Sequence, residues 1–386
     1  MERVFRVLAI LACITVGLSA GSPQRALAQD AIFFNKRGIE YYKKGQYDKA
    51  IANYNKAIKL NPKYTIAYNN RGLAYSKKKL YNKAIANYNK AIKLNPKFAI
   101  TYNNRGRAYY LKKAYGKAIA DYNKTIQLNP KYVIAYKNRG LAYYTKQAYD
   151  KAIADYNKAI KLNPESAIAY NNRGYTYYSK KNYNKAIADY NKAIKLDQEF
   201  AIAYNNRGLV YYDKKAYDKA ITDYNKAIKL DPKYAIAYNN RGLVCYDKKA
   251  YKKAIADYNK AIKLKPNYAI AYNNRGLAYF HKKVYNKAIA GYNKAIKLDS
   301  KYANAYNNRG LAYFHKKAYD KAIADYNKAI KLNPRFAKAY NNRGYAYYFK
   351  KAYNKARVDV HQAQSLGYNV EKKFWEKLRR DSGREQ

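Results

Sequence analysis

Histidine and cysteine are common metal ligands in proteins, and this chain has few of either. Among 386 residues there are three histidines and two cysteines. His281 and His315 stand at equivalent places in a repeating sequence, so a metal pair is conceivable, but no third ligand lies near them and zinc sites use at least three protein ligands. Cys13 and Cys245 are too far apart for a zinc cluster or a disulfide framework. We therefore expect no metal and no cofactor.

Motifs typical of catalysis are also missing from the sequence. There is no glycine-rich phosphate loop, no nucleophile elbow and no paired-carboxylate site. Every abundant polar residue instead recurs at a fixed place in a repeat. We therefore predict that the protein is not an enzyme.

An arginine and an aspartate recur along most of the chain with a constant spacing, as in Arg105 and Asp121. A guanidinium and a carboxylate make strong paired hydrogen bonds when two elements bring them together. We therefore expect a structural ion pair across a helical hairpin. Asn53, Asn87 and Gly291 stand in place of the aspartate, and their repeats should be the least constrained.

The elements that position these residues follow a 34-residue period. In both halves of each repeat, apolar residues recur at helical spacing, which predicts two helices joined by a short turn. The second helix should end at a Leu-Asn-Pro sequence such as 94–96, because proline cannot continue a helix. After a lead-in at 29–30, the ten repeats are 31–64, 65–98, 99–132, 133–166, 167–200, 201–234, 235–268, 269–302, 303–336 and 337–370.

This repeat resembles the tetratricopeptide repeat. The second repeat carries the resemblance at Tyr68, Gly72, Tyr75, Ala84, Tyr88, Ala91 and Pro96. The eighth residue is glycine and the twentieth alanine in all ten repeats, which allows close helix packing. The resemblance implies an all-α fold, a right-handed superhelical solenoid of ten helix-turn-helix repeats. Proline is missing at Gln198, Ser300 and Tyr368, where we expect softer turns.

Residues 367–386 are predicted to form a capping helix and a polar tail. Gly367 can end the preceding helix in a left-handed conformation, and Asn369 can cap a last helix that runs to about Arg380. An apolar stripe on this helix should cover the open end of the core. The stripe consists of Val370, Phe374, Trp375 and Leu378.

The resemblance also implies that the first helix of each repeat lines a concave groove. Asparagine and an aromatic residue recur at two of its inward positions, and asparagine amides can bond the backbone of an extended chain whatever its side chains. Tyrosines beside them add rigid contact area. The alternative is that these asparagines are neutral residues copied with the repeat. The candidate peptide-binding residues are Asn70, Asn104, Asn138, Asn172, Asn206, Asn240, Asn274, Asn308, Asn342, Tyr110, Tyr144, Tyr178, Tyr212 and Tyr246.

The thirteenth residue of the repeat varies while its neighbours do not, so it could determine selectivity. The candidates are Asp213, Asp247, His281 and His315. The chaperone-binding members of the family hold a terminal carboxylate with lysine, asparagine and arginine at set groove positions. Only Lys137 matches the lysine, and no arginine follows, so we do not expect that type of binding.

The chain is strongly basic, with 79 Lys plus Arg against 25 Asp plus Glu and a formal charge of +54. Most lysines fall on the expected turns and convex face, as at Lys214, Lys215 and Lys219. They either keep the array soluble or attract polyanions. Nucleic acid is disfavoured as a partner, because the groove has almost no positive charge.

The first 28 residues have the layout of a secretory signal, with an arginine-containing start and an apolar run over 7–20. We predict cleavage after Ala28 and a periplasmic or extracellular location. No segment is long enough to span a membrane.

The sequence therefore predicts a protein–protein interaction scaffold of the cell envelope, a monomer or weak oligomer, that holds an extended and acidic polypeptide in its groove. The alternative is a cationic adhesin or envelope-organising protein whose convex lysine face binds anionic envelope polymers.

Overall fold

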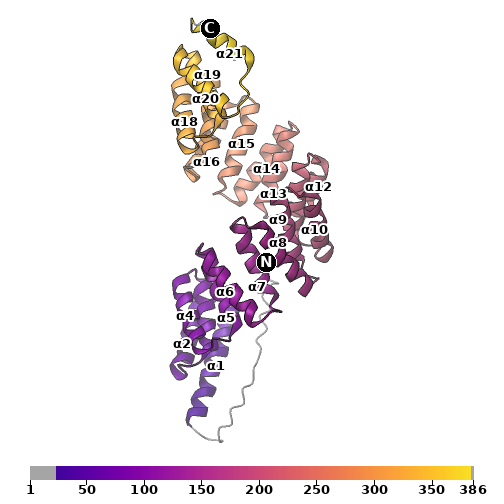
Figure 1. Ribbon diagram of the computed structural model, residues 1–386, viewed down its shortest axis with the longest axis vertical. Coiled ribbons are helices and arrows are strands. Elements are labelled where there is room, and N and C mark those ends of the chain that lie inside the picture. The colour runs from indigo at the N-terminus through magenta and orange to yellow at the C-terminus, as the bar shows by residue number, and fades with distance from the viewer. Residues whose placement is uncertain (1–22, 384–386) are drawn as a thin grey trace. The chain divides into compact units, whose positions relative to one another are not determined.

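The computed structural model describes residues 23–383, and these form twenty-one helices and no strand. The chain divides into two compact units, Met1–Lys180 and Lys181–Gln386. In both units successive helices pack as antiparallel hairpins (Figure 1), which confirms the predicted all-α repeat fold.

The first unit contains helices α1 to α9. Their bounds are α1 Pro23–Lys43, α2 Tyr47–Leu60, α3 Thr65–Lys77, α4 Tyr81–Leu94, α5 Ala99–Leu111, α6 Tyr115–Leu128, α7 Val133–Thr145, α8 Tyr149–Leu162 and α9 Ala167–Ser179. Helix α1 begins before the first repeat and runs through the expected cleavage site at Ala28. The greater part of the predicted signal, residues 1–22, lies outside the described residues.

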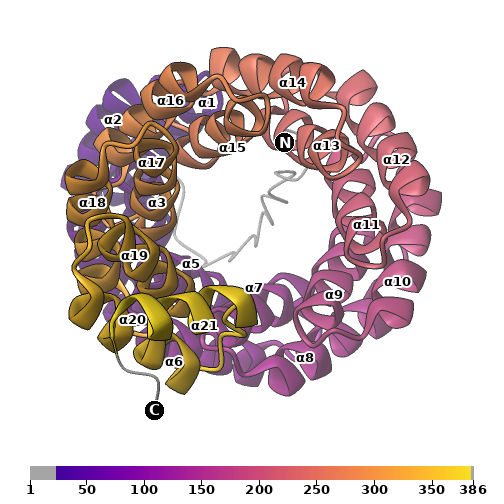
Figure 2. The same cartoon turned by 90° about the horizontal axis from the view of Figure 1, so that it is seen from above.

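The second unit contains helices α10 to α21. Their bounds are α10 Tyr183–Leu196, α11 Ala201–Asp213, α12 Tyr217–Leu230, α13 Ala235–Asp247, α14 Tyr251–Leu264, α15 Ala269–His281, α16 Tyr285–Leu298, α17 Ala303–His315, α18 Tyr319–Leu332, α19 Ala337–Phe349, α20 Tyr353–Ser365 and α21 Lys372–Asp381. In Figure 2, α11, α13 and α15 lie on the inner side of this unit's curve and α10, α12 and α14 on the outer side. These three first helices therefore face the concave side, as expected. Within the described residues, no helix combines the length and the apolar character that crossing a membrane requires.

The turn inside each hairpin has a left-handed residue. In the sixth repeat Lys215 has a φ of 58°, its N–H donates to the Tyr212 carbonyl (2.8 Å), and the Ala216 N–H donates to the Tyr211 carbonyl (2.8 Å). These two bonds close the end of α11 as a Schellman motif. Glycine is the residue that normally tolerates this conformation, and it is used only at Gly45; the same place holds a non-glycine residue in the nine following repeats.

The turn between repeats is held by the residue that follows the second helix. Asn61 and its equivalents accept the N–H two residues further on, as Lys63 donates to Asn61 Oδ1 (3.0 Å). Asp197 and Asp299 make the same bond in two repeats that lack proline, and α10 and α16 end at the usual place. The expected softening is therefore not visible in the turn geometry, because the side-chain bond is kept where the proline is lost.

In eight repeats the core of the hairpin is a glycine facing a tyrosine, and in the tenth Gly344 faces Val360. At Gly310 an added Cβ would lie 2.7 Å from the Tyr326 ring, which is fully buried. Equivalent tyrosines pack with the alanines of the next repeat, as Tyr292 does with Ala312. Close approach at the glycine is thus what lets one ring fill the hairpin and reach its neighbour.

Helix α21 covers the end of the last repeat with the predicted stripe. Val370, Phe374 and Leu378 are buried and Trp375 packs beside them. The predicted cap at Asn369 is wrong: the N-cap residue is Glu371, and its side chain makes no capping bond. The chain needs the extra residues after Gly367 to reach the exposed face of α19.

Candidate functional site

The predicted groove asparagines are bonded to one another within each unit. Asn104 donates through Nδ2 to Oδ1 of Asn69 in the preceding repeat (3.0 Å), and Asn69 donates to Oδ1 of Asn70 beside it (3.3 Å). The asparagines at the position of Asn69 are buried, whereas those at the position of Asn70 are half-buried. The other inter-repeat bonds join Asn70 to Asn35, Asn138 to Asn103, Asn240 to Asn205, Asn274 to Asn239, Asn308 to Asn273 and Asn342 to Asn307. We call these residues the asparagine ladder.

The ladder changes what the groove can offer a ligand. An asparagine amide has two N–H groups and two acceptor lone pairs. Residues such as Asn274 use one N–H toward the preceding repeat and one lone pair toward their neighbour, Asn273. One donor and one acceptor therefore remain at Asn240, Asn274 and Asn308. The ladder therefore joins neighbouring repeats, and residues such as Asn274 also keep hydrogen-bonding groups that are not used within the protein. The sequence alone did not distinguish these two roles.

The ladder has a break and an end. Lys137 takes the buried position of one rung, and burial lowers the pKa of its ammonium. At the last repeat Asn341 Oδ1 is buried without a hydrogen-bond partner among the described residues. The reason is positional, since no further repeat follows to donate to it.

Isoleucines run beside the ladder at the second position of the repeat. In the second unit Ile202, Ile236 and Ile270 have exposed fractions of 37%, 37% and 45%. They stand at the start of α11, α13 and α15, which lie on the inner side of that unit (Figure 2). A row of exposed apolar side chains at a constant period is a candidate interaction surface.

The predicted groove tyrosines contact the variable position of the next repeat. The Tyr212 hydroxyl donates to Asp247 Oδ2 (2.7 Å), and Tyr110 and Tyr144 share hydrogen bonds with Thr145 (3.1 Å) and Ser179 (3.0 Å). Tyr246 lies edge-on to His281, with ring centroids 5.4 Å apart. Burial is the main cause that raises the pKa of Tyr246 to about 12. Of the remaining candidates, Tyr178 lies in α9 of the first unit and Asp213 in α11 of the second.

The two predicted selectivity histidines are packed between aromatic rings. His281 stacks on Tyr251 (5.6 Å, 15°) and His315 on Tyr285 (5.6 Å, 15°), and both also contact Phe280. Burial lowers the pKa of both imidazoles. Within residues 23–383 no group of three or more His, Cys, Asp or Glu side chains could hold a metal ion.

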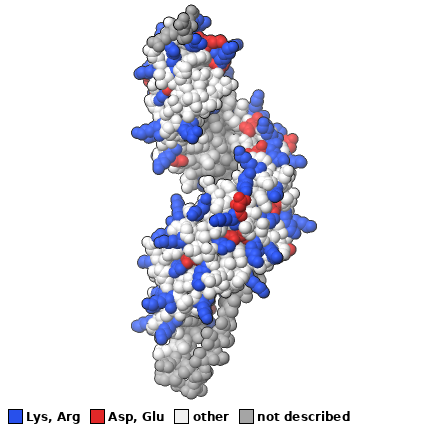
Figure 3. Space-filling view, in the orientation of Figure 1, with Lys and Arg blue, Asp and Glu red and all other residues white. Residues whose placement is uncertain are grey.

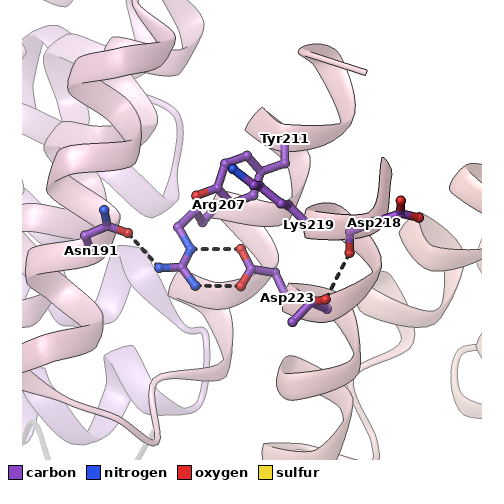
Figure 4. Close-up of a pocket in the computed structure, with 7 residues that line it drawn as sticks. Asn191, Arg207, Tyr211, Asp218, Lys219 and Asp223 are labelled. Atoms are coloured by element: carbon purple, nitrogen blue, oxygen red, sulfur yellow. Dashed lines mark hydrogen bonds and ion pairs between the residues drawn. The ribbon is translucent and has the colours of Figure 1, made fainter. Parts of the chain in front are cut away.

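The predicted ion pair is confirmed in six repeats, two in the first unit and four in the second. In Figure 4, Arg207 donates through Nε and Nη2 to both oxygens of Asp223 (2.8 and 2.6 Å) and through Nη1 to Asn191 of the preceding repeat (2.6 Å). The bond to Asn191 was not predicted, because it depends on how repeats stack. The pairs are Arg105–Asp121, Arg139–Asp155, Arg207–Asp223, Arg241–Asp257, Arg309–Asp325 and Arg343–Asp359.

Repeats without the aspartate differ from one another. Arg71 donates to Asn87 instead (2.7 Å), and burial lowers its pKa, whereas the hydrogen bond to Asp121 raises the pKa of Arg105. Arg275 faces Gly291, and its Nε is buried without a partner. The expected loss of constraint is therefore clearest in the eighth repeat.

The Arg207–Asp223 ion pair forms one wall of a shallow surface cavity of about 440 Å³. Its other lining residues include Tyr211, Asp218, Lys219 and Thr222 (Figure 4). The Thr222 hydroxyl donates to the Asp218 carbonyl (2.9 Å), and Lys219 lies over the Tyr211 ring (5.8 Å). Arg207, Asp223, Asn191 and Thr222 are already hydrogen-bonded within this wall, so we do not treat the cavity as a second candidate site.

Sequence comparisons find repeats of one family along the chain. A model described as "TPR repeat" matches 38–79, 106–147, 174–215, 208–248, 242–283 and 278–317, which is more than half of the chain. Two models described as "Tetratricopeptide repeat" match 65–98, 133–166 and 303–336, and 155–188 and 325–358. A search of curated proteins found no match.

Solved structures with a similar fold come from several sources. The APC/C hetero-tetramer Cut9–Hcn1 has 18% identity and a TM-score of 0.57, covering 91% of this chain and 76% of that chain. A tetratricopeptide repeat protein from Parabacteroides merdae has 22% identity and a TM-score of 0.55, covering 65% and 99%. The human IFIT1 dimer with m7Gppp-AAAA has 16% identity and a TM-score of 0.54, covering 90% and 94%. At these identities the likeness shows the fold, and with the repeat matches it supports a protein-interaction scaffold.

Proposed function

Because the chain belongs to the tetratricopeptide repeat family, we propose that it is a scaffold that binds extended polypeptide along the inner helices of its repeats. The observation that carries the proposal is the exposed isoleucine row beside the asparagine ladder. Ile202, Ile236 and Ile270 offer apolar contact at a constant period. Beside this row, Asn240 and Asn274 each keep one free donor and one free acceptor.

The chemistry of this groove suits recognition through the ligand backbone. An extended chain presents one N–H and one carbonyl per residue, which match the spare donor and acceptor of Asn240 and Asn274. Alternate side chains of an extended chain point to the same side, where the isoleucines lie. The ligand is an acidic polypeptide, because the formal charge of +54 steers acidic partners toward the protein, although the groove itself carries almost no positive charge.

We further propose that this scaffold works outside the cytoplasm. The arginine-containing start and apolar run of residues 1–20 motivate this, together with the alanines at positions 26 and 28. The mature protein would then begin at Gln29, within the first turns of α1. Intact-mass measurement of the protein from the expressing cell tests this, and a chain that retains residues 1–28 would contradict it.

The binding test uses a permanently unfolded acidic protein, reduced and carboxymethylated α-lactalbumin, as a fluorescent probe. The variant Ile202→Gln, Ile236→Gln, Ile270→Gln should weaken binding by roughly tenfold or more, since three anchors of about 0.5–1 kcal/mol each are lost. The loss should persist at high salt, because apolar contacts are not screened.

The matched control replaces three exposed apolar residues outside the groove: Leu80→Gln, Val284→Gln, Val358→Gln. Its affinity should equal that of the parent chain. Equal losses in both variants, or binding that disappears at high salt in the parent chain, would show that the groove does not hold the probe.

A further inference from the structure

Six lysines occupy the strained residue of the hairpin turns in the second unit. Their φ angles are between 56° and 60°. They recur once per repeat without interruption, whereas Gln147 interrupts the corresponding series in the first unit. We call them the turn-lysine row: Lys181, Lys215, Lys249, Lys283, Lys317 and Lys351.

The backbone at these positions disfavours any residue with a Cβ. A left-handed L-residue brings its Cβ close to the following carbonyl oxygen, which glycine avoids. Gly45, at φ 74°, shows that the same turn forms with glycine. Strained residues that persist are a reason to look for a function of the side chain.

The turn-lysine row has no structural role visible in the contacts of the described residues. All six side chains are exposed, and none makes a hydrogen bond, an ion pair or a ring contact within residues 23–383. The preceding lysine differs in five of the six turns: Lys214, for example, donates to Asn184 (3.2 Å) and Lys248 pairs with Asp218 (2.7 Å). That residue already places a cation at the C-terminus of the first helix, where it interacts favourably with the helix dipole.

We propose that the turn-lysine row binds a linear acidic polysaccharide. Adjacent first helices such as α11 and α13 contact each other, so successive lysines recur at roughly the 10 Å spacing of packed helices. Sparse point charges at this interval fit a polymer whose carboxylates are also well separated. Double-stranded DNA carries a charge about every 1.7 Å and would leave most of its phosphates unpaired.

Two further observations favour this class of partner. The rings closest to the turns are packed on each other, as Tyr212 is on Tyr217 (6.0 Å) and Tyr251 on His281 (5.6 Å), which leaves few open faces for base stacking. Basic side chains also outnumber acidic ones on the face shown in Figure 3. The proposal concerns the turns and is independent of the groove.

The test compares two variants of the full chain that lose the same charge. The row variant carries Lys215→Gly, Lys249→Gly, Lys283→Gly and Lys317→Gly. The control carries Lys229→Gln, Lys263→Gln, Lys297→Gln and Lys331→Gln, at exposed lysines on the second helices. The probe is a fluorescent oligogalacturonide at about 0.1 M ionic strength, with thymidine oligonucleotide and phosphatidylglycerol vesicles as comparisons.

The row variant should bind the oligogalacturonide roughly tenfold more weakly, while the control changes little, because four directed charge contacts are lost. The thermal midpoint of the row variant should rise, since glycine relieves the turn strain. Equal losses in both variants would reduce the effect to bulk charge and overturn the proposal. A lower thermal midpoint of the row variant would show that the lysines have a structural role, and would overturn the proposal. Row-dependent binding that is tighter for the oligonucleotide or the vesicles would identify a different partner and would overturn it too.

Discussion

At the scale of single residues, polar side chains in this protein serve to join repeats. Arg207 holds Asp223 in its own repeat and Asn191 in the preceding one, while its side chain stays 20% exposed. The asparagine ladder does the same on the inner side. Buried polar groups are stable only when they are hydrogen-bonded, so these two networks select one stacking geometry.

The eighth repeat lacks this support, and Gly291→Asp should restore it. The new carboxylate can accept from Arg275 Nε, which is buried without a partner. We expect a gain of about 1 kcal/mol, because charged hydrogen bonds contribute roughly 1.5–3 kcal/mol and the helices must separate slightly. The Cβ would lie 3.0 Å from the Tyr272 carbonyl. Slower amide exchange in α16 is the measurement.

Gly291→Ala is the control for this substitution. It adds the same Cβ without a carboxylate, and crowding at that Cβ offsets the higher helix propensity of alanine, so exchange in α16 should stay equal or become faster. If Asp and Ala have the same effect, then Arg275 gains nothing from a partner and the ion pairs of the other repeats contribute little.

At the scale of elements, the hairpin depends on one close contact between its helices. In the ninth repeat α17 and α18 meet where Gly310 faces the Tyr326 ring. In the tenth repeat the corresponding residue of α20 is Val360, and an added Cβ on Gly344 would lie 3.2 Å from it. The equivalent glycine thus packs against a rigid ring in the ninth repeat and against a smaller side chain in the tenth.

Gly310→Ala should therefore destabilise the ninth repeat more than Gly344→Ala does the tenth. An added methyl group 2.7 Å from a fully buried ring forces a shift that costs about 1–3 kcal/mol. At Gly344 the valine can adjust, and alanine's better helix propensity offsets part of the cost. Urea denaturation of the two variants measures the difference. Equal midpoints would mean that the tyrosine ring is not what keeps the helices at this distance.

At the scale of the whole molecule, each repeat is stabilised chiefly by its neighbours in its own unit. The clusters of buried residues each join one hairpin to the next, as Tyr224 joins Val244. The last hairpin has α21 in place of a further repeat, and Phe374 stacks on Tyr345 (3.6 Å, 12°). In such arrays stability is the sum of repeats and their interfaces, so local damage stays local.

Leu378→Ala should loosen the end of the array and leave its middle unchanged. Leu378 is fully buried, and truncation of a buried leucine costs about 2–5 kcal/mol. Hydrogen exchange should accelerate in α19, α20 and α21 but not in α11 to α14. Lys373→Ala, at an exposed residue of the same helix, should change neither region. Acceleration throughout the second unit would show that it unfolds as a single cooperative block.

The repeat architecture could be predicted from the sequence because it is written in local patterns. Helix bounds follow from apolar periodicity and from the breakers between helices, and these signals act within a few residues. The pairing of Arg105 with Asp121 was also predictable, since both belong to one hairpin. The position of Asn369 was misjudged because α21 begins where the chain reaches the exposed end of α19.

Contacts between repeats were decided only by the tertiary structure. That Asn274 bonds Asn239, that Arg207 bonds Asn191 and that His281 stacks on Tyr251 all depend on the rotation between successive hairpins, which no local pattern encodes. The left-handed lysines were hidden for a related reason, because the turn closes by backbone bonds that any residue can make. Local sequence determined the hairpin of this protein, and packing between hairpins decided which polar groups remain free to bind a partner.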